Sequence, residues 1–312
     1  MHPGPHRRSP RRHPLGAVLA ALLLTTIVAA CSGGEPSGAT GGPDLGTIEP
    51  GVIKVAYEPY APYTSLEGDQ LTGLDADILN AAAQKLNLQV SPVETDFPGM
   101  LASVQARRVD ITIGGVAWTA DRQKQGLFTD PPYYSPPAMA VRQGESFTSV
   151  ADLQGRSLGT VEGYVWVDAI KQIPGANLHV YPDAASVFTD LNAGRIDGAF
   201  LDPLIIIAAQ RSGANSAIAT TYLTPPTAAE VKAHPAYSYF QPYMTGFYLP
   251  PQETQLQTAL NEQINAMYKD GSLGALITKY GGDPAQFLKP SADMSAQRHA
   301  VDRPANWTPP SV

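Results

Sequence analysis

Residues 105–122, QARRVDITIGGVAWTADR, predict the end of one helix, a buried strand and the beginning of a second helix. The apolar run Val109–Val116 is typical of a buried strand. Thr119 is a favourable N-cap for the following helix, and Asp121 suits the positive end of the helix dipole. Arg122 in the same turn is unfavourable there by roughly 0.3–1 kcal/mol.

Two interpretations of Arg122 are open at this point. Its guanidinium stands beside free backbone N–H groups at the carboxyl end of a strand, where open α/β sheets bind ligands, so Arg122 is a candidate anion anchor. Alternatively, it is a surface arginine paired with a neighbouring acid.

One signature of this stretch occurs twice in the chain. Residues 105–113 and residues 192–200 each end a helix with Ala-x-Arg-x-Asp and then begin a strand. The spacing of 87 residues is too long for a solenoid repeat and suits two lobes of related design. Asp110 and Asp197 precede these strands, so we expect structural roles for both.

The rest of the pattern predicts an α/β fold in two lobes. Short strands such as 52–57 and 157–161 alternate with helical spacings, and Gly73 and Asp75 predict a turn and an N-cap. Extended segments near 138–142 and 244–249 bracket the middle third, which predicts a two-strand hinge beside a ligand cleft. The predicted domains are lobe 1 (48–139 and 247–290), lobe 2 (140–246) and a loose C-terminal tail (291–312).

The N-terminus predicts export. Residues 1–30 combine four arginines with an apolar run that is short for a membrane span, as in a secretory signal peptide. Cys31, the single cysteine, excludes an internal disulfide and follows small residues in a pattern that resembles a bacterial lipobox. We therefore expect lipidation of Cys31, a flexible tether over 31–47 and anchoring to the outer face of the cell membrane. A plain signal peptidase site is the alternative.

Charge and motifs exclude several function classes. Without residues 1–30 the chain has 17 basic and 28 acidic residues, a net charge of −11, which argues against nucleic acid as a partner. There is no nucleophile elbow, phosphate loop or metal-spaced histidine cluster in the sequence. We expect a binding protein without a metal or cofactor, not an enzyme.

Several motifs, in this order along residues 51–288, resemble the bacterial solute-binding proteins of family 3, the polar amino-acid-binding proteins of ABC importers. The motifs are Tyr60–Tyr63, Gly73–Asp77, Thr119–Arg122, Phe128–Tyr134, and Lys269–Leu273 with Lys279–Gly281. The resemblance implies a periplasmic-binding-protein fold, a monomer, and capture of an amino acid or similar zwitterion for an ABC permease. Two alternatives stay open: a ligand sensor for a membrane kinase, and an enzyme similar to periplasmic prephenate or arogenate dehydratases, with Glu58 or Glu162 as general acid.

The resemblance also implies roles for individual residues. Arg122 would hold a ligand α-carboxylate through two parallel hydrogen bonds, and Asp202 would bind the α-ammonium. As alternatives, Asp202 before Pro203 is simply an N-cap, or fills both roles. Tyr60 and Phe97 would sandwich the ligand side chain, although either could be ordinary core.

The chain departs from the family pattern beside Arg122. Ala117 stands where a serine or threonine is usual, and Gly163-Tyr164-Val165 replaces a turn rich in hydroxyl groups. Trp118 adds an aromatic ring, so the expected cleft is unusually aromatic and favours a cationic or bulky ligand side chain. The predicted ligand-binding residues are Arg122, Asp202, Tyr60, Phe97, Gly115, Ala117, Trp118, Tyr164 and Val165.

Overall fold

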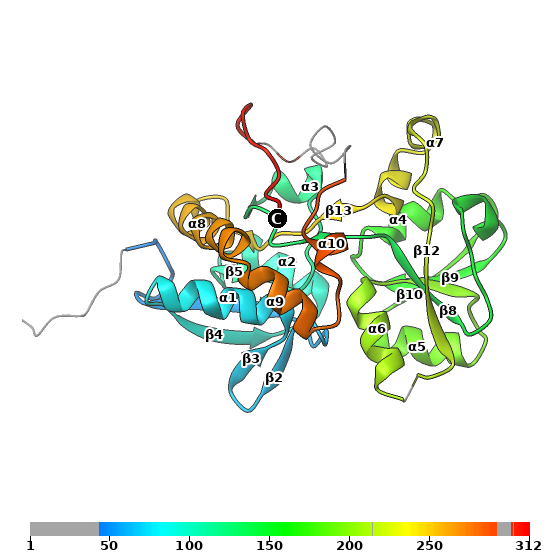
Figure 1. Ribbon diagram of the computed structural model, residues 1–312, viewed down its shortest axis with the longest axis horizontal. Helices are drawn as coiled ribbons and strands as arrows, with labels where there is room; N and C mark the ends of the chain where they lie inside the picture. Colours follow the sequence, from blue (N-terminus) through cyan, green and yellow to red (C-terminus); the bar gives the residue numbers. More distant parts are fainter. Residues whose placement is uncertain (1–43, 214, 292–300, 302) are drawn as a thin grey trace, which may run out of the picture. The chain divides into compact units, whose positions relative to one another are not determined.

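The computed structural model describes residues 44–213, 215–291, 301 and 303–312 (Figure 1). The predicted signal peptide, Cys31 and tether residues 32–43 lie outside these ranges, so lipid anchoring stays a prediction. The described residues belong to one compact unit, Thr40–Val312. Within them, no helix combines the length and the apolar composition that a bilayer-spanning helix requires.

The first sheet has the strand order β4-β1-β5-β14-β6. Strand β1 pairs in parallel with β4 and β5, whereas β14 is antiparallel to both β5 and β6. The strands are β1 (Val52–Tyr57), β4 (Gln89–Glu94), β5 (Ile111–Thr112), β6 (Leu127–Phe128) and β14 (Tyr248–Leu249). The associated hairpin and helices are β2 (Ser65–Glu67), β3 (Gln70–Thr72), α1 (Leu74–Lys85), α2 (Phe97–Gln105), α3 (Ala120–Gln123), α8 (Thr254–Asp270), α9 (Ser272–Lys279) and α10 (Pro284–Phe287).

The second sheet has the order β10-β9-β11-β8-β12, in which β9, β10 and β11 are parallel and β8 is antiparallel to both of its neighbours, β11 and β12. The strands are β8 (Ala138–Arg142), β9 (Ser157–Val161), β10 (Asn177–Tyr181), β11 (Gly198–Phe200) and β12 (Ile218–Tyr222). The helices are η1 (Val150–Leu153), α4 (Trp166–Lys171), α5 (Ala184–Asn192), α6 (Pro203–Arg211), α7 (Ala228–Ala233) and η2 (Pro235–Phe240). The predicted α/β class is confirmed.

The chain passes from the first sheet to the second and back through two short strands. These strands, β7 (Tyr134–Ser135) and β13 (Tyr243–Met244), pair with each other in antiparallel fashion. The prediction that residues 138–142 form a hinge strand is wrong, because they are β8 of the second sheet. Of the expected segment 244–249, Met244 lies in the crossover strand β13, whereas 248–249 is β14 of the first sheet. The lobe boundaries stay predictions.

The repeated signature has the same structure in both lobes. The Asp110 carboxylate accepts hydrogen bonds from the backbone N–H groups of Ile48 and Lys54, both at 2.7 Å, and so fixes the beginning of β1. The Asp197 carboxylate accepts from the N–H of Ser157, the first residue of β9, at 2.8 Å. The structural roles expected for both aspartates are confirmed.

Asp75 was expected to cap a helix, and this prediction is wrong. The first N–H groups of α1 bond instead to the carbonyls of Pro62 and Tyr63, so no side-chain cap is needed. The buried Asp75 carboxylate accepts from the N–H groups of Gly114 and Gly115, at 2.7 and 2.9 Å, and from the Tyr133 hydroxyl at 2.7 Å. It therefore holds the turn that follows β5.

The structure also differs from the expected loose tail. Among the described tail residues, Val301 is buried, and Arg303 donates to the carbonyls of Phe128 and Thr129. The Tyr134 hydroxyl donates to the carbonyl of Pro310. The polar, proline-containing composition suggested a solvated segment, but these residues bond to strand ends of the first sheet and the crossover.

The two aspartates of the repeat provide a matched stability test. Asp110 is fully buried with two N–H partners, whereas the side chain of Asp197 is 33% exposed and has one. Because a buried N–H without a partner costs roughly 1–3 kcal/mol, we expect Asp110→Ala to lower the free energy of unfolding by about 2–4 kcal/mol. Asp197→Ala should cost about 1 kcal/mol in the same urea titration. Equal losses would contradict these roles.

Candidate ligand-binding site

A small pocket brings together residues of both lobes and of the crossover. Its lining consists of Phe97, Gly114, Gly115, Ala117, Arg122, Tyr164, Val165, Trp166, Asp202 and Tyr243. Its volume is about 20 Å³, and one ordered water occupies roughly 10–15 Å³ on this measure. The described conformation is therefore closed, and a larger ligand requires the lobes to move apart before it can enter.

Arg122 supplies the positive charge of this pocket. It lies on the four-residue helix α3, where the Thr119 hydroxyl accepts from the Arg122 N–H at 3.1 Å, so the predicted N-cap is confirmed. The guanidinium donates to the carbonyls of Ala117 and Gly163, at 2.8 and 3.1 Å, and lies over the Phe97 ring. Burial lowers the pKa of Arg122 to about 10, so it stays protonated at neutral pH.

The alternative of an ion-paired surface arginine is wrong for the described part of the chain. The ion pairs found there involve Lys54, Arg107, Lys124, Arg142, Lys171, Arg195, Lys279 and Arg303, and none involves Arg122. The partners of the Arg122 guanidinium are neutral carbonyl groups and a ring face. An anionic ligand would therefore be its first carboxylate partner in this pocket.

Asp202 supplies the negative charge. It precedes α6 at the N-cap position, but its side chain makes no capping hydrogen bond, so the simple N-cap alternative is wrong. Its carboxylate accepts from the hydroxyls of Tyr60 (3.1 Å), Ser135 (3.4 Å) and Tyr243. Burial raises the pKa of Asp202 to about 6, with these hydroxyl donors opposing the shift.

Phenol groups take over the capping of α6. The N–H of Asp202 donates to the Tyr60 hydroxyl at 3.2 Å, and the N–H of Leu204 donates to the Tyr63 hydroxyl at 3.3 Å. Tyr60 and Tyr63 are stacked with ring centroids 5.5 Å apart. Tyr60 is thus one hydrogen bond behind the pocket lining, where it orients Asp202.

The predicted aromatic residues divide into two groups. Phe97 and Tyr164 line the pocket and meet edge to face, with ring centroids 4.8 Å apart. Trp118 does not line it; the indole is fully buried against Phe128 and Trp307. Adjacent residues of an extended segment point to opposite faces, so Ala117 faces the pocket and Trp118 faces away.

The sequence did not single out Gly114, Trp166 or Tyr243 as lining residues. Trp166 follows Tyr164 and Val165 directly, so proximity to them was an available signal. Tyr243 belongs to the crossover strand β13, and no local pattern links it to Asp202. Gly115 has a positive φ of 68°, and a Cβ there would lie 3.3 Å from the Asp202 carboxylate, which explains why glycine is needed.

Glu58 joins the lobes beside the pocket without lining it. The Tyr164 hydroxyl donates to its carboxylate at 2.6 Å, and the residue is 6% exposed. Burial raises the pKa of Glu58 to about 7, and the nearby acids Asp202, Asp96 and Asp183 add to the shift while Tyr164 opposes it. Glu162, the other acid considered at this position of the chain, is exposed.

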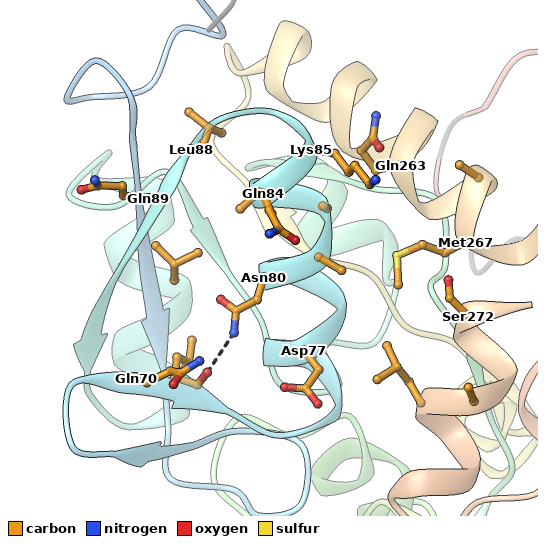
Figure 2. Close-up of a pocket in the computed structure, with 18 of the residues that line it drawn as sticks. Gln70, Asp77, Asn80, Gln84, Lys85, Leu88, Gln89, Gln263, Met267 and Ser272 are labelled. Carbon is orange, nitrogen blue, oxygen red and sulfur yellow. Dashed lines mark hydrogen bonds between the residues drawn. The ribbon is translucent and has the colours of Figure 1, made fainter. Parts of the chain in front are cut away.

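Two larger hollows share no residue with the pocket. One, of about 760 Å³, is lined by Glu58, Glu94, Asp96 and Asp183 together with apolar and neutral residues. The other, of about 1240 Å³, lies between α1, α8, α9 and β3 (Figure 2). Figure 2 shows Asp77, Asn80 and Gln84 along α1 in this second hollow, which contains none of the predicted site residues.

Metal coordination has no candidate in the described ranges, where no group of three histidine, cysteine, aspartate or glutamate side chains could hold an ion. A half-buried guanidinium and a buried carboxylate, each held by neutral groups, line one cavity. Such a pair is complementary to a ligand that carries both signs of charge.

Comparisons with known proteins identify the family of this chain. Residues 53–283 match the family described as "Bacterial extracellular solute-binding proteins, family 3". The L-cystine-binding protein TcyJ of Escherichia coli strain K12 is 28% identical over 239 residues, covering 75% of this chain and 84% of that protein. The histidine-binding periplasmic protein of Salmonella typhimurium is 26% identical over 242 residues, covering 74% and 88%.

Solved structures agree on the fold. The substrate-binding protein of an amino acid ABC transporter superposes with a TM-score of 0.64 at 24% identity, covering 74% of this chain and 99% of that one. A structure reported for glutathione import by GshT and the cystine ABC importer TcyBC of Streptococcus mutans gives 0.66 at 18%, covering 78% and 99%. The predicted two-lobed fold is confirmed, and the match over residues 53–283 shows that this protein belongs to the bacterial extracellular solute-binding proteins of family 3.

Proposed function

We propose that this protein captures an amino acid, or a similar zwitterion, between Arg122 and Asp202 and delivers it to an ABC permease. One observation carries the proposal: the Arg122 guanidinium and the Asp202 carboxylate line the same pocket, and each is hydrogen-bonded to neutral groups instead of to the other. A zwitterion with adjacent carboxylate and ammonium groups would complete both. Capture would accompany closure of the lobes, and the closed form would dock on the permease.

The hydrogen-bonding capacity of the two groups fits this role. A guanidinium has five N–H donors, and Arg122 makes side-chain hydrogen bonds to the carbonyls of Ala117 and Gly163. Its remaining donors are available for a carboxylate, which a planar guanidinium binds through two parallel bonds. The carboxylate of Asp202 would accept from the ligand ammonium, either in addition to or in place of a tyrosine hydroxyl. Ala117 has no side-chain hydroxyl to offer a ligand, and its backbone carbonyl orients Arg122.

The acidic hollow supports a ligand with a cationic side chain. Glu58, Glu94, Asp96 and Asp183 line it, and no lysine, arginine or histidine stands among its lining residues in the described structure. A cleft lined by one sign of charge concentrates ligands of the other sign. The preference for a cationic side chain therefore rests on these acidic residues and not on Trp118, which lies outside the pocket. Relatives include arginine-binding and histidine-binding proteins, whose names agree with a basic amino acid.

We propose binding without turnover. The dehydratase alternative needs a general acid inside the pocket, but Glu58 lies in the adjacent hollow and Glu162 is exposed. One solved neighbour, at 22% identity, is an ancestral amino acid-binding protein described as a precursor of cyclohexadienyl dehydratase. That likeness bears on the fold alone. Lipidation of Cys31, attachment to the outer face of the membrane and a monomeric state belong to the same proposal.

Calorimetric titration of the purified chain from residue 32 with arginine, lysine, glutamine and glutamate tests the ligand class. We expect the basic amino acids to bind most tightly. Arg122→Ala should weaken binding by about 100-fold, because charge-assisted hydrogen bonds contribute roughly 1.5–3 kcal/mol each. Arg156→Ala is the matched control, since Arg156 also lies over a ring, that of Phe147, but lines no part of the pocket. Tightest binding of glutamate would contradict the charge argument, and no binding of any zwitterion would contradict the function.

The pKa of Asp202, about 6, predicts a pH dependence of binding. The ligand ammonium needs the ionised carboxylate, so affinity should be constant above pH 7 and fall about tenfold per pH unit below 6. The stability contribution of Asp202 has the opposite sign: because its folded-state pKa is raised, the contribution is complete below about pH 4 and is lost as the pH rises through 6.

The effect of Glu58 on the pH dependence of affinity must be distinguished from that of Asp202, since the pKa of Glu58, about 7, lies in the same range. Calorimetry between pH 4.5 and 8 on the unmodified protein and on Glu58→Gln does this. The amide can still accept from Tyr164, and the fall in affinity below pH 6 should persist in the variant. If Glu58→Gln abolished the fall, Glu58 and not Asp202 would carry it.

A further inference from the structure

The C-terminal segment 303–312, which we call the strap, packs on the first lobe and lies outside the region matched to the family, 53–283. Arg303 is its main contact, with a side chain only 7% exposed. Its guanidinium donates to the carbonyls of Phe128 and Thr129, at 2.8 and 2.9 Å, and lies 3.4 Å from the Asp130 carboxylate. Arg303 therefore binds the end of β6.

The strap also covers Trp118. The Arg303 guanidinium lies over the indole at 4.3 Å from its centroid, and the Trp307 ring lies 5.7 Å from it. Trp307 is itself fixed, because its indole N–H donates to the Asp130 carboxylate at 2.9 Å. A cation over the face of a buried indole is attracted by the ring quadrupole. Trp118 is thus held from one side by Phe128 and contacted by two residues of the strap.

Trp118 stands between the two residues that orient Arg122. The carbonyl of Ala117 accepts from the Arg122 guanidinium, and the Thr119 hydroxyl caps its helix. The backbone N–H of Trp118 donates to the carbonyl of Met244 in β13, at 3.0 Å. A four-residue helix such as α3 has no stability of its own and depends on packing by its neighbours. Trp118 therefore belongs to the segment on which the position of Arg122 depends.

The far end of the strap contacts the crossover. The hydroxyl of Tyr134, in β7, donates to the carbonyl of Pro310 at 2.5 Å. Tyr134 pairs with Met244 of β13, the residue that accepts from Trp118. The strap thus contacts the segment that carries Arg122 and one strand of the pair through which the lobes are joined.

We propose that the strap is a positioning element for ligand binding, with Arg303 as its principal positioning residue. Arg303 and Trp307 hold Trp118 in place, and Trp118 fixes the Ala117–Arg122 segment in the geometry that a ligand carboxylate requires. Arg303 is not part of the pocket lining, and its contact with Trp118 connects it to the Arg122 segment. The binding consequence rests on the proposed function, whereas the ordering of residues 117–123 does not.

Two measurements on the full chain from residue 32 test this role. The variants are Arg303→Ala, Arg303→Lys and the control Arg107→Gln, which breaks an arginine–carboxylate pair with Glu253 in the same lobe. In the ligand-free proteins, amide exchange over residues 117–123 should be about tenfold faster in Arg303→Ala than in the control. Arg303→Lys should be intermediate, because it keeps the charge over Trp118 but loses the planar fork.

Affinity for the tightest-binding amino acid, measured below the unfolding temperature of every variant, should fall about tenfold in Arg303→Ala and less than about twofold in Arg107→Gln. Equal exchange over 117–123 in Arg303→Ala and the control would overturn the strap's role. Faster exchange with unchanged affinity would overturn its effect on binding. If the unmodified protein bound no zwitterion, the proposed function would fail, and the exchange data would still decide whether the strap orders this segment.

Discussion

A protonated guanidinium that is withdrawn from water must be hydrogen-bonded, and the geometry of the Arg122 turn follows from that constraint. The carbonyls of Ala117 and Gly163 satisfy part of it, one from each lobe. For Ala117 to do so, the chain must turn sharply between β5 and α3. The buried Asp75 carboxylate holds that turn by accepting from Gly114 and Gly115. A carboxylate in α1 thus determines where a cation in α3 lies.

Asp202, in the second lobe, carries the opposite charge to Arg122 and likewise needs hydrogen-bond partners. Ionised and buried, it needs donors, and three hydroxyls supply them without neutralising its charge. The hydroxyls of Tyr60 and Tyr63 accept from N–H groups at the start of α6, so the carboxylate is released from the capping role that its position in the chain would otherwise assign. Two charges of opposite sign are thereby kept apart but complementary. A ligand shifts the lobes toward closure only by the difference between its affinities for the closed and open forms, and these charges provide that difference.

Much of this site could be predicted because its signals are local. Thr119, Arg122 and Asp202 lie at the beginnings of helices that follow strands. In each lobe, the aspartate of the Ala-x-Arg-x-Asp signature accepts a hydrogen bond from a backbone N–H of a neighbouring strand. The sequence did not predict the direction of one side chain or the contacts between residues that are distant in the chain. Trp118 was assigned to the pocket because it neighbours Ala117 in sequence, but the extended backbone turns it to the other face. Tyr243 and the strap residue Arg303 are distant in sequence from their partners Asp202 and Trp118, and their composition alone does not indicate those contacts.

The central claim is that Arg122 holds the ligand carboxylate, and a thermodynamic cycle between ligand and protein tests it most directly. Calorimetry would compare the tightest-binding amino acid with the amine that lacks its α-carboxylate, on the unmodified protein and on Arg122→Ala. The account predicts that loss of the carboxylate weakens binding by about 100-fold in the unmodified protein and by less than about threefold in the variant. An equal loss in both proteins would show that the carboxylate binds elsewhere and would contradict the account.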